Sequence, residues 1–212
     1  NEDLTSGINI RSAGAMSENK GRSMLGIQKS GPLDIDGATA RSWLMLPTNP
    51  NGHRNSEVLK PFWNGDDLTS RCRDKWLIDL PRGTSEAEAT LWEAPFQYLR
   101  SAPYDPDDPN SLTLKDERAK ARDSHARERW WEPYWPRPEM RRAIEALPRY
   151  IVTPETATYR TFIWLRYPVL PDKNLIVIPR EDDTTFGILH SRMHELWTLR
   201  MGTRLGVGND SR

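Results

Sequence analysis

The sequence predicts an α/β (mixed α+β) fold, with helices packed mainly on one face of a twisted mixed sheet and loops gathered at one edge. Three β-rich runs, residues 150–152, 159–165 and 175–178, are separated by turns that contain proline. Apolar side chains then recur at helical spacing along residues 186–197 and form one face. Patterning alone therefore predicts a sheet with one long helix laid across it.

That helix has recognisable signals at both ends. Asp182 and Asp183 precede it, where a carboxylate can accept from the first free N–H groups and acidic charge suits the helix dipole. Gly202 lies where a left-handed cap would end it. The predicted apolar face consists of Phe186, Leu189, Met193, Leu196 and Trp197.

The first part of the chain alternates short elements with turns. Residues 1–23 are rich in Ser, Gly and Asn and are expected to form an irregular N-terminal segment, followed by a short strand at 24–29. Residues 38–46 have the pattern of a short helix, stopped by the proline that follows. A second short helix is expected at 56–59, capped by its serine.

The middle of the chain predicts one strand and three helices. Residues 75–80 form a convincing strand of mixed burial. A helix is expected from 84 to 100, with a kink or early end because a proline falls inside it. The densely charged residues 115–131 predict a helix that lies mostly in solvent. Pro138 suits the first position of a further helix, residues 139–146.

Composition limits the class of protein. Lys+Arg and Asp+Glu balance at 30 each among 212 residues, so any nucleic-acid footprint must be local. Cys72 is the one cysteine, which excludes an internal disulfide and fits a reducing, cytoplasmic compartment. No apolar run approaches the ~20 residues of a membrane helix. We expect a single domain over residues 24–212, cut from a longer protein.

Two histidines suggest a metal site that other residues argue against. His190 and His194 lie four residues apart on the predicted long helix, so both could face one ion. The order is not that of a zinc-protease motif, and no third ligand stands nearby in the sequence. Apolar neighbours surround both histidines, so a structural role is favoured and no metal is predicted.

Catalytic patterns are incomplete. Asp172 and Lys173 suggest a nuclease, but no further acid and lysine follow at strand spacing, and Asp182 and Asp183 are explained as helix caps. A methyltransferase would need a glycine-rich cofactor loop and an Asn/Asp-Pro-Pro-aromatic loop, and residues 48–51 are not one. We therefore predict no catalytic residue and no cofactor within this chain.

An aromatic cluster interleaved with arginines has two interpretations. Its members are Trp130, Trp131, Tyr134 and Trp135, flanked by Arg127, Arg129 and Arg137. Rings and guanidinium groups together can grip nucleic acid. The favoured alternative is that Trp130 and Trp131 pin an irregular segment to the core, which leaves the arginines as the better contact candidates.

The last residues offer short polar groups on a glycine-rich backbone. Asn209 and Arg212 are the types of side chain that read adenine and guanine edges bidentately, and Asp210 could accept from cytosine N4. From these residues alone, an ordinary frayed end is the preferred interpretation.

Several segments occur together in an order that resembles a known family. They are KWLIDL (75–80), RERWWEPYWPRP (127–138), LPRYIVTP (147–154), TFIWL (161–165), LPDKNLIVI (170–178) and FGILHSRMHELWTLRMGTRLG (186–206). The upstream pattern Pro61…Asn64-Gly65-x-Asp67-Leu68 resembles the entry of specificity domains in adenine methyltransferases more widely. Taken together, the six segments resemble the target-recognition domain of MmeI-like restriction-modification enzymes. In these single-chain proteins a nuclease domain and an N6-adenine DNA methyltransferase domain are joined to a specificity domain.

The resemblance implies that this chain binds double-stranded DNA and reads its bases. It implies that catalysis and S-adenosylmethionine binding belong to the methyltransferase domain of the parent chain, which would be this domain's protein partner. The base-reading side chains implied by position are Asn209, Asp210 and Arg212. The residues expected to hold phosphates are Lys20, Arg22, Lys75, Arg129, Arg160 and Arg204.

Two other classes remain open. A protein-interaction domain that docks subunits of a restriction-modification complex would suit the neutral net charge, and it needs an exposed apolar patch. A stand-alone metal hydrolase that uses His190 and His194 would contain bound metal.

Overall fold

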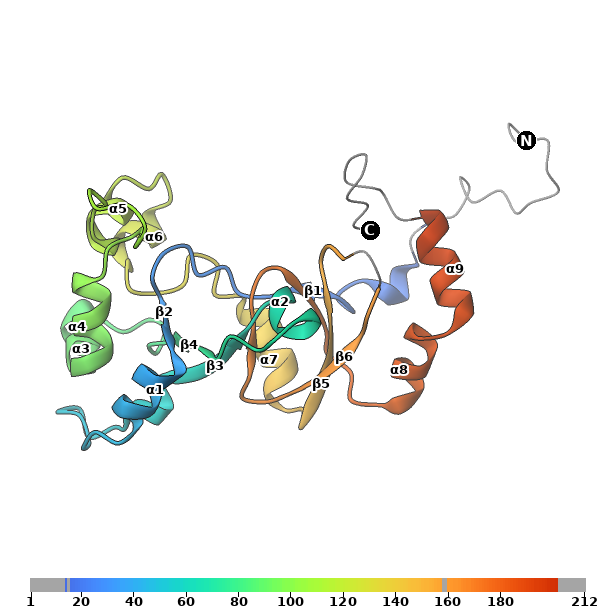
Figure 1. Ribbon diagram of the computed structural model, residues 1–212, viewed down its shortest axis with the longest axis horizontal. Helices are drawn as coiled ribbons and strands as arrows, with labels where there is room; N and C mark the ends of the chain where they lie inside the picture. The colour runs from blue at the N-terminus through green and yellow to red at the C-terminus, as the bar shows by residue number, and fades with distance from the viewer. Residues whose placement is uncertain (1–13, 15, 158–159, 202–212) are drawn as a thin grey trace.

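The computed structural model describes residues 14, 16–157 and 160–201, which form an elongated molecule (Figure 1). Two four-stranded sheets occupy the middle, a lobe of short helices stands at one end, and two helices stand at the other. A single cluster of buried apolar side chains runs from the helical lobe through both sheets. The predicted mixed α+β class is confirmed, but the strands form two sheets rather than one.

The first sheet is antiparallel and contains the three predicted β-rich runs. Its strand order is β1 (Met24–Leu25), β8 (Leu175–Ile178), β5 (Arg149–Pro154), β6 (Ile163–Arg166). Strand β5 is central, with Tyr150 opposite Leu165 and Val152 opposite Val177. These four side chains are buried, because β-branched and aromatic residues pack well on a pleated surface.

The second sheet has the order β2 (Asp34–Asp36), β4 (Lys75–Ile78), β3 (Leu59–Trp63), β7 (Leu170–Pro171), with β7 parallel to β3. The helix expected at 56–59 is wrong. A 3-10 turn, η3 (Asn55–Glu57), leads directly into strand β3. Pro61 is tolerated there because it pairs with Trp76 of β4 alone, while β7 pairs only with the next two residues.

The two sheets are joined by backbone hydrogen bonds at residues 171 and 172. On one side the N–H of Asp172 donates to the carbonyl of Trp63 over 2.7 Å. On the other side the N–H of Ile27 donates to the carbonyl of Pro171 over 2.8 Å. A Cβ atom added at Gly26 would lie 2.1 Å from the Asp172 carbonyl oxygen. The chain segments are therefore in contact at a point where only glycine fits.

The helical lobe contains α1 (Gly37–Leu44), α3 (Glu86–Thr90), α4 (Glu93–Ser101), α5 (Leu114–Ala119) and α6 (Ser124–Glu128). Each of the two longer helices predicted here is broken in two. The first restarts at Glu93, which puts Pro95 in the first turn of α4, where no N–H is needed. The second restarts after Asp123, whose carboxylate accepts from Ala126 N–H over 2.9 Å.

The interior of the lobe confirms the favoured interpretation of the aromatic cluster. Trp130 and Trp131 are each 2% exposed, pack edge to face with each other, and contact Phe96 of α4. Trp135 is 46% exposed. The first two rings therefore pin the segment after α6 to the core.

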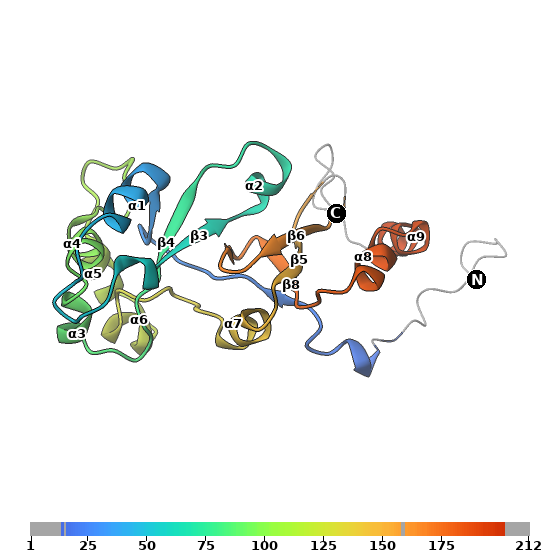
Figure 2. The same cartoon turned by 90° about the horizontal axis from the view of Figure 1, so that it is seen from below.

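Helices α2 (Gly65–Thr69) and α7 (Pro138–Glu145) lie on opposite sides of the middle of the molecule (Figure 2). Together with the grouping of helices at both ends, this differs from the expected arrangement on one face of one sheet. Pro138 occupies the first position of α7, as predicted. Because the strands form two sheets in the middle of an elongated molecule, the helices cover its ends as well as its faces.

The predicted long C-terminal helix is two helices, α8 (Asp183–Leu189) and α9 (Arg192–Met201). Asp182 caps the first as expected, accepting from Thr185 N–H over 2.7 Å. Ser191 interrupts the run, because its hydroxyl accepts from His194 N–H and starts a new helix. The imidazoles of His190 and His194 pack edge to face on Phe162. The apolar surroundings expected for them are not formed, because Met193 is 82% exposed and Leu196 50%.

Replacing Gly26 by alanine is expected to lower the free energy of unfolding by at least about 2 kcal/mol, because the new methyl group meets backbone that cannot move aside. Gly187 in α8 is the matched control. No atom lies within 4 Å of a Cβ built there, so Gly187→Ala should be neutral or stabilise by up to about 1 kcal/mol. Urea unfolding of both variants measures this. Equal stabilities of the two variants would contradict the proposed junction.

Candidate nucleic-acid interface

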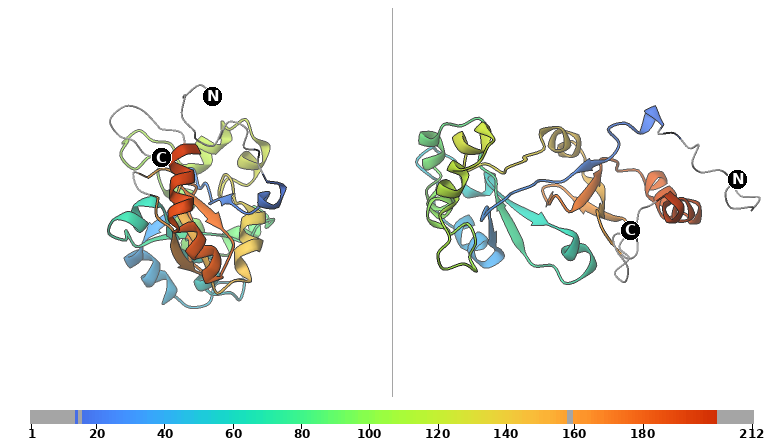
Figure 3. Two further views of the ribbon diagram at one scale, coloured as in Figure 1. Left: turned by 90° about the vertical axis from the view of Figure 1, so that its right-hand side faces the viewer. Right: turned by 90° about the horizontal axis from the view of Figure 1, so that it is seen from above.

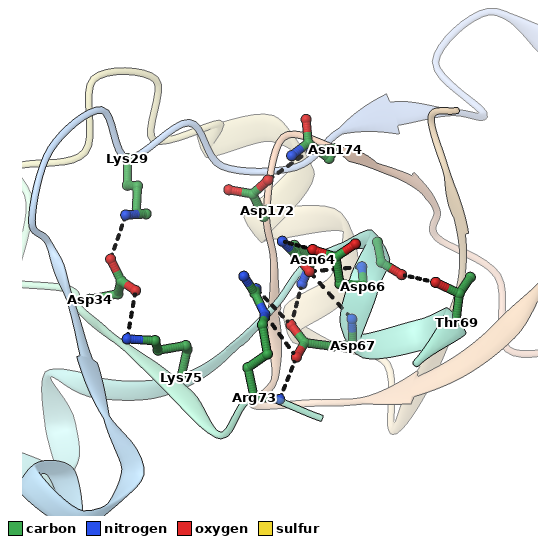
Figure 4. A network of polar contacts seen from close by, with 11 residues as sticks. Lys29, Asp34, Asn64, Asp66, Asp67, Thr69, Arg73, Lys75, Asp172 and Asn174 are labelled. Carbon is green, nitrogen blue, oxygen red and sulfur yellow. Dashed lines mark hydrogen bonds and ion pairs between the residues drawn. The ribbon is translucent and has the colours of Figure 1, made fainter. Parts of the chain in front are cut away.

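The motif Asn64-Gly65-x-Asp67-Leu68 forms a tightly bonded turn at the start of α2 (Figure 4). The Asn64 side chain accepts from Asp66 N–H over 2.9 Å, and the Asp67 carboxylate accepts from Asn64 N–H over 2.8 Å. Arg73 donates to the same carboxylate from its backbone N–H over 2.7 Å and from its guanidinium over 3.0 Å. Burial raises the pKa of Asp67, but these hydrogen bonds outweigh it and the net pKa is lowered.

A second polar cluster joins β2 to β4. Strand pairing sets Asp34 opposite Leu77 of β4, and its carboxylate forms an ion pair with Lys29 and lies 3.9 Å from the ammonium group of Lys75 (Figure 4). Lys29 also donates to the carbonyl of Gly31 over 3.2 Å. One carboxylate is thus shared by two ammonium groups, which leaves a local excess of positive charge.

Asp172 contributes a carboxylate from the junction of the two sheets. The side chain accepts from Asn174 N–H over 3.0 Å, and the residue is 8% exposed. Burial raises the pKa of Asp172, although the positive charges of Lys29 and Lys173 act in the opposite direction. The carboxylate is therefore desolvated in the free protein, with cations close by.

These groups line two adjoining hollows, which we call together the polar groove. The first has a volume of about 340 Å³ and is lined by Lys29, Asp34, Asn64, Arg73, Asp172, Lys173 and Asn174, with Gln28, Ser30, Gly31 and Phe62. The second has a volume of about 620 Å³ and lies between α2 and the residues that follow β5. Asn64 and Asn174 line both hollows, so the groove is continuous.

The groove presents the side-chain types that nucleic acids recognise. Lys29, Arg73 and Lys173 can donate to phosphate oxygens or to guanine, while the Asn64 and Asn174 amides offer both donors and acceptors. The Asp172 carboxylate is an acceptor suited to an exocyclic amine. Within the described part of the chain, no group of three or more His, Cys, Asp or Glu side chains is arranged to hold a metal ion.

Two of the predicted phosphate-binding residues border the groove. The ammonium group of Lys75 lies 3.9 Å from the carboxylate of Asp34, which lines the first hollow. Arg160 stands beside the second hollow, where its guanidinium donates to the carbonyl of Pro154 over 2.6 Å. Burial lowers the pKa of Arg160 from its ordinary value. Neither side chain lines the groove itself, but each contacts a residue that does: Asp34 for Lys75 and Pro154 for Arg160.

The other predicted residues lie elsewhere or outside the described residues. Lys20 and Arg22 follow the turn η2 (Ser17–Asn19), and neither lines the groove. Arg129 follows α6 and donates to the carbonyl of Thr84 over 2.5 Å, so its guanidinium braces the helical lobe. Four predicted positions lie outside the described residues: Arg204, Asn209, Asp210 and Arg212.

The predicted site residues did not include several residues that line the groove. The sequence carried a signal for some of these residues and none for others. Lys29 has no distinctive local pattern, and Arg73 lies in a turn. Asp172 and Asn174, however, belong to the quoted segment LPDKNLIVI, and Asn64 belongs to the other quoted motif. The two motifs are far apart in the sequence, and residues of both line the groove, which makes this surface the candidate site.

No helix among the described residues is both long and apolar enough to span a bilayer.

The raised pKa of Asp172 predicts a specific dependence of stability on pH. Because the folded state holds this proton more tightly than the unfolded state, the stability that the proton confers is complete below the unfolded pKa of 3.8 and is lost as pH rises through the folded pKa. Asp172→Asn retains an acceptor for Asn174 but cannot ionise. Its free energy of unfolding, relative to the unmodified protein, should therefore increase as pH rises above about 4.

Asp182→Asn is the control of opposite sign. Hydrogen bonds from Thr185 lower the pKa of Asp182, so the stability that its ionised carboxylate confers on the unmodified protein relative to this variant should be complete above about pH 4 and should be lost as pH falls below that value. Urea unfolding at a series of pH values measures both. Parallel pH profiles for the two variants would contradict the assignment.

No protein-family profile and no curated protein sequence matches this chain. Among solved structures, the chain is similar to the type IIL restriction-modification enzyme MmeI, whose structure was determined in complex with DNA. The TM-score is 0.61 at 15% sequence identity, and the match covers 89% of this chain. The chain spans 23% of the length of the MmeI chain. The described residues therefore have the fold of one part of a restriction-modification enzyme.

Proposed function

We propose that this chain is the target-recognition domain of a restriction-modification enzyme and that it binds duplex DNA along the polar groove. The observation that carries the proposal is the meeting of the two family-like motifs in one groove lined by cations, amides and a desolvated carboxylate. The fold it shares with part of MmeI, an enzyme solved with DNA, supports the same function.

The groove suggests a division of labour between its side chains. Lys29, Lys75 and Lys173 would hold phosphates, which fixes register on the duplex without reading sequence. Asp172 and Asn174 would report base edges, because only groups with directional donors and acceptors distinguish base pairs. Burial of the Asp172 carboxylate favours this role, since part of its desolvation cost is already met before DNA arrives.

The C-terminal residues belong to the same proposal. Asn209, Asp210 and Arg212 would add base contacts, and Arg204 a phosphate contact, as the resemblance implies. Each bidentate pair would contribute about 1–3 kcal/mol against a wrong base. Catalysis and S-adenosylmethionine binding would belong to a methyltransferase domain of the parent chain, so the domain itself would carry out no reaction.

DNA binding that uses phosphate contacts must weaken with salt. The affinity of this chain for a mixed-sequence duplex should fall steeply between about 50 and about 200 mM salt. Lys173→Ala should lower the affinity at every sequence tested and reduce the slope of log affinity against log salt by about one. Fluorescence anisotropy of labelled duplex measures both quantities.

Lys120→Ala is the matched control, because this lysine lies in the helical lobe and pairs with Glu117 over 2.9 Å. Its affinity and salt slope should equal those of the unmodified protein. Binding that is insensitive to salt, or equal losses in the two lysine variants, would contradict the proposed use of the groove.

A second candidate function, protein docking, is favoured by the apolar face of α9. Met193 is 82% exposed, Leu196 50% and Trp197 49%, and the end-on view shows α9 as the outermost described element (Figure 3). Phe186 and Phe162 anchor the helix pair to β6 from the other side. Such a face suits a partner protein surface, and the methyltransferase domain of the parent chain is the proposed occupant.

Docking predicts slower amide exchange along α9 in the full-length parent than in this chain alone, because a covered helix opens less often. Strand β5, which is already buried here, is the internal reference and should exchange alike in both. Unchanged exchange along α9 would rule out this face as the docking surface.

A further inference from the structure

Arg118 of α5 is buried, although the charged residues around it predicted a solvent-exposed helix. It is 3% exposed, and its guanidinium reaches out of the helical lobe to the loop at residues 28–31. One terminal nitrogen donates to the carbonyls of Lys29 and Ser30, each over 2.8 Å. The other donates to the carbonyl of Glu132 over 3.3 Å. The loop that presents Lys29 to the groove is thus held from a helix 88 to 89 residues away.

No carboxylate among the described residues forms an ion pair with Arg118. Its partners among the described residues are backbone carbonyls and the ring of Tyr134, whose centroid lies 5.3 Å from the guanidinium carbon. A buried charge without an opposite charge is costly, and an apolar side chain of similar volume would usually give a more stable core. The cost is explained if the guanidinium performs a task that an apolar side chain cannot perform.

The loop needs such support because its backbone is unusual. Ser30 has φ of 49° and Gly31 has φ of 116°, and the first of these is unfavourable for a residue with a side chain. A Cβ atom at Gly31 would lie 2.7 Å from the Leu114 side chain, so the loop also sits tightly against α5. Without the guanidinium, the Ser30 carbonyl would lose its bond from Arg118, and the Lys29 carbonyl would keep only the longer bond from the N–H of Tyr134, at 3.3 Å.

We propose that Arg118 is a positioning residue, which fixes the loop at residues 28–31 so that Lys29 enters the groove in the geometry required for DNA. This inference rests on the proposed function of the groove and extends it to the helical lobe. The lobe then contributes to DNA affinity without touching DNA, through the bonds from Arg118 to the loop carbonyls.

A double-mutant cycle with Arg118→Met and Lys29→Ala tests the proposal, with affinity measured on the mixed-sequence duplex. Arg118→Met keeps an unbranched apolar stem and removes the donors, so it should weaken binding about threefold to tenfold through the loss of a preordered loop. In the presence of Lys29→Ala, the same substitution should have no further effect, because the residue that it positions is gone.

Two further variants separate positioning from general loss of stability. Arg141 is a part-buried arginine bonded to Asp79 over 2.6 Å, and Arg141→Met should lower stability without changing DNA affinity. Arg118→Lys keeps a donor and a charge, so it should restore part of the affinity lost in Arg118→Met. If Arg118→Met does not fold, the cycle is measured with Arg118→Lys. Hydrogen exchange should be faster at residues 28–31 in either Arg118 variant.

The outcomes distinguish the two proposals. If the unmodified chain shows no salt-dependent binding of duplex, the proposed function fails. If it binds but the Arg118 variant binds equally well, the function stands and the positioning role is overturned. Multiplicative losses from the Lys29 and Arg118 substitutions would also overturn it, because they would mean that the two residues act independently.

Discussion

The backbone hydrogen bonds of Pro171 and Asp172 constrain the whole molecule, because they connect both sheets. Trp63 of β3 and Ile27 of the segment after β1 are bonded on opposite sides of these two residues. The approach is so close that Gly26 has no room for a side chain. The same short segment directs the Asp172 carboxylate into the polar groove. The position of the candidate site is therefore a direct consequence of how the sheets are joined.

Buried polar side chains in this protein mostly order loops. Asp67 is 6% exposed and accepts from the backbone of Asn64 and Arg73, and Glu132 is 1% exposed and accepts from Gly83 N–H over 3.2 Å. Arg118, also buried, donates to the backbone carbonyls of Lys29 and Ser30. Each group offsets its desolvation by bonding backbone that belongs to no helix or strand. Irregular segments thereby acquire a defined conformation.

Neutral overall charge does not exclude the proposed DNA-binding groove, because two lysines there share one carboxylate. In the groove, Lys29 and Lys75 share Asp34, while Arg73 is matched by Asp67. Paired charges of this kind lower nonspecific attraction and keep directional donors in place. Helix α9 stands at one end of the molecule, whereas the groove lies at the sheets in the middle, so DNA binding and protein docking would use separate surfaces (Figure 1). The two proposed functions are thus complementary.

The sequence by itself determined the local features: the mixed α+β class, the three β-rich runs of the first sheet, and caps such as Asp182, because these depend on neighbouring residues. The sequence did not predict the breaks in the longer helices. A serine such as Ser191 can lie within a helix or cap one, and it acts as a cap only where the chain turns. Tertiary structure alone decided that there are two sheets, that Arg118 is buried, and that two distant motifs form one groove. Those outcomes depend on contacts between segments far apart in the chain, which no local periodicity encodes.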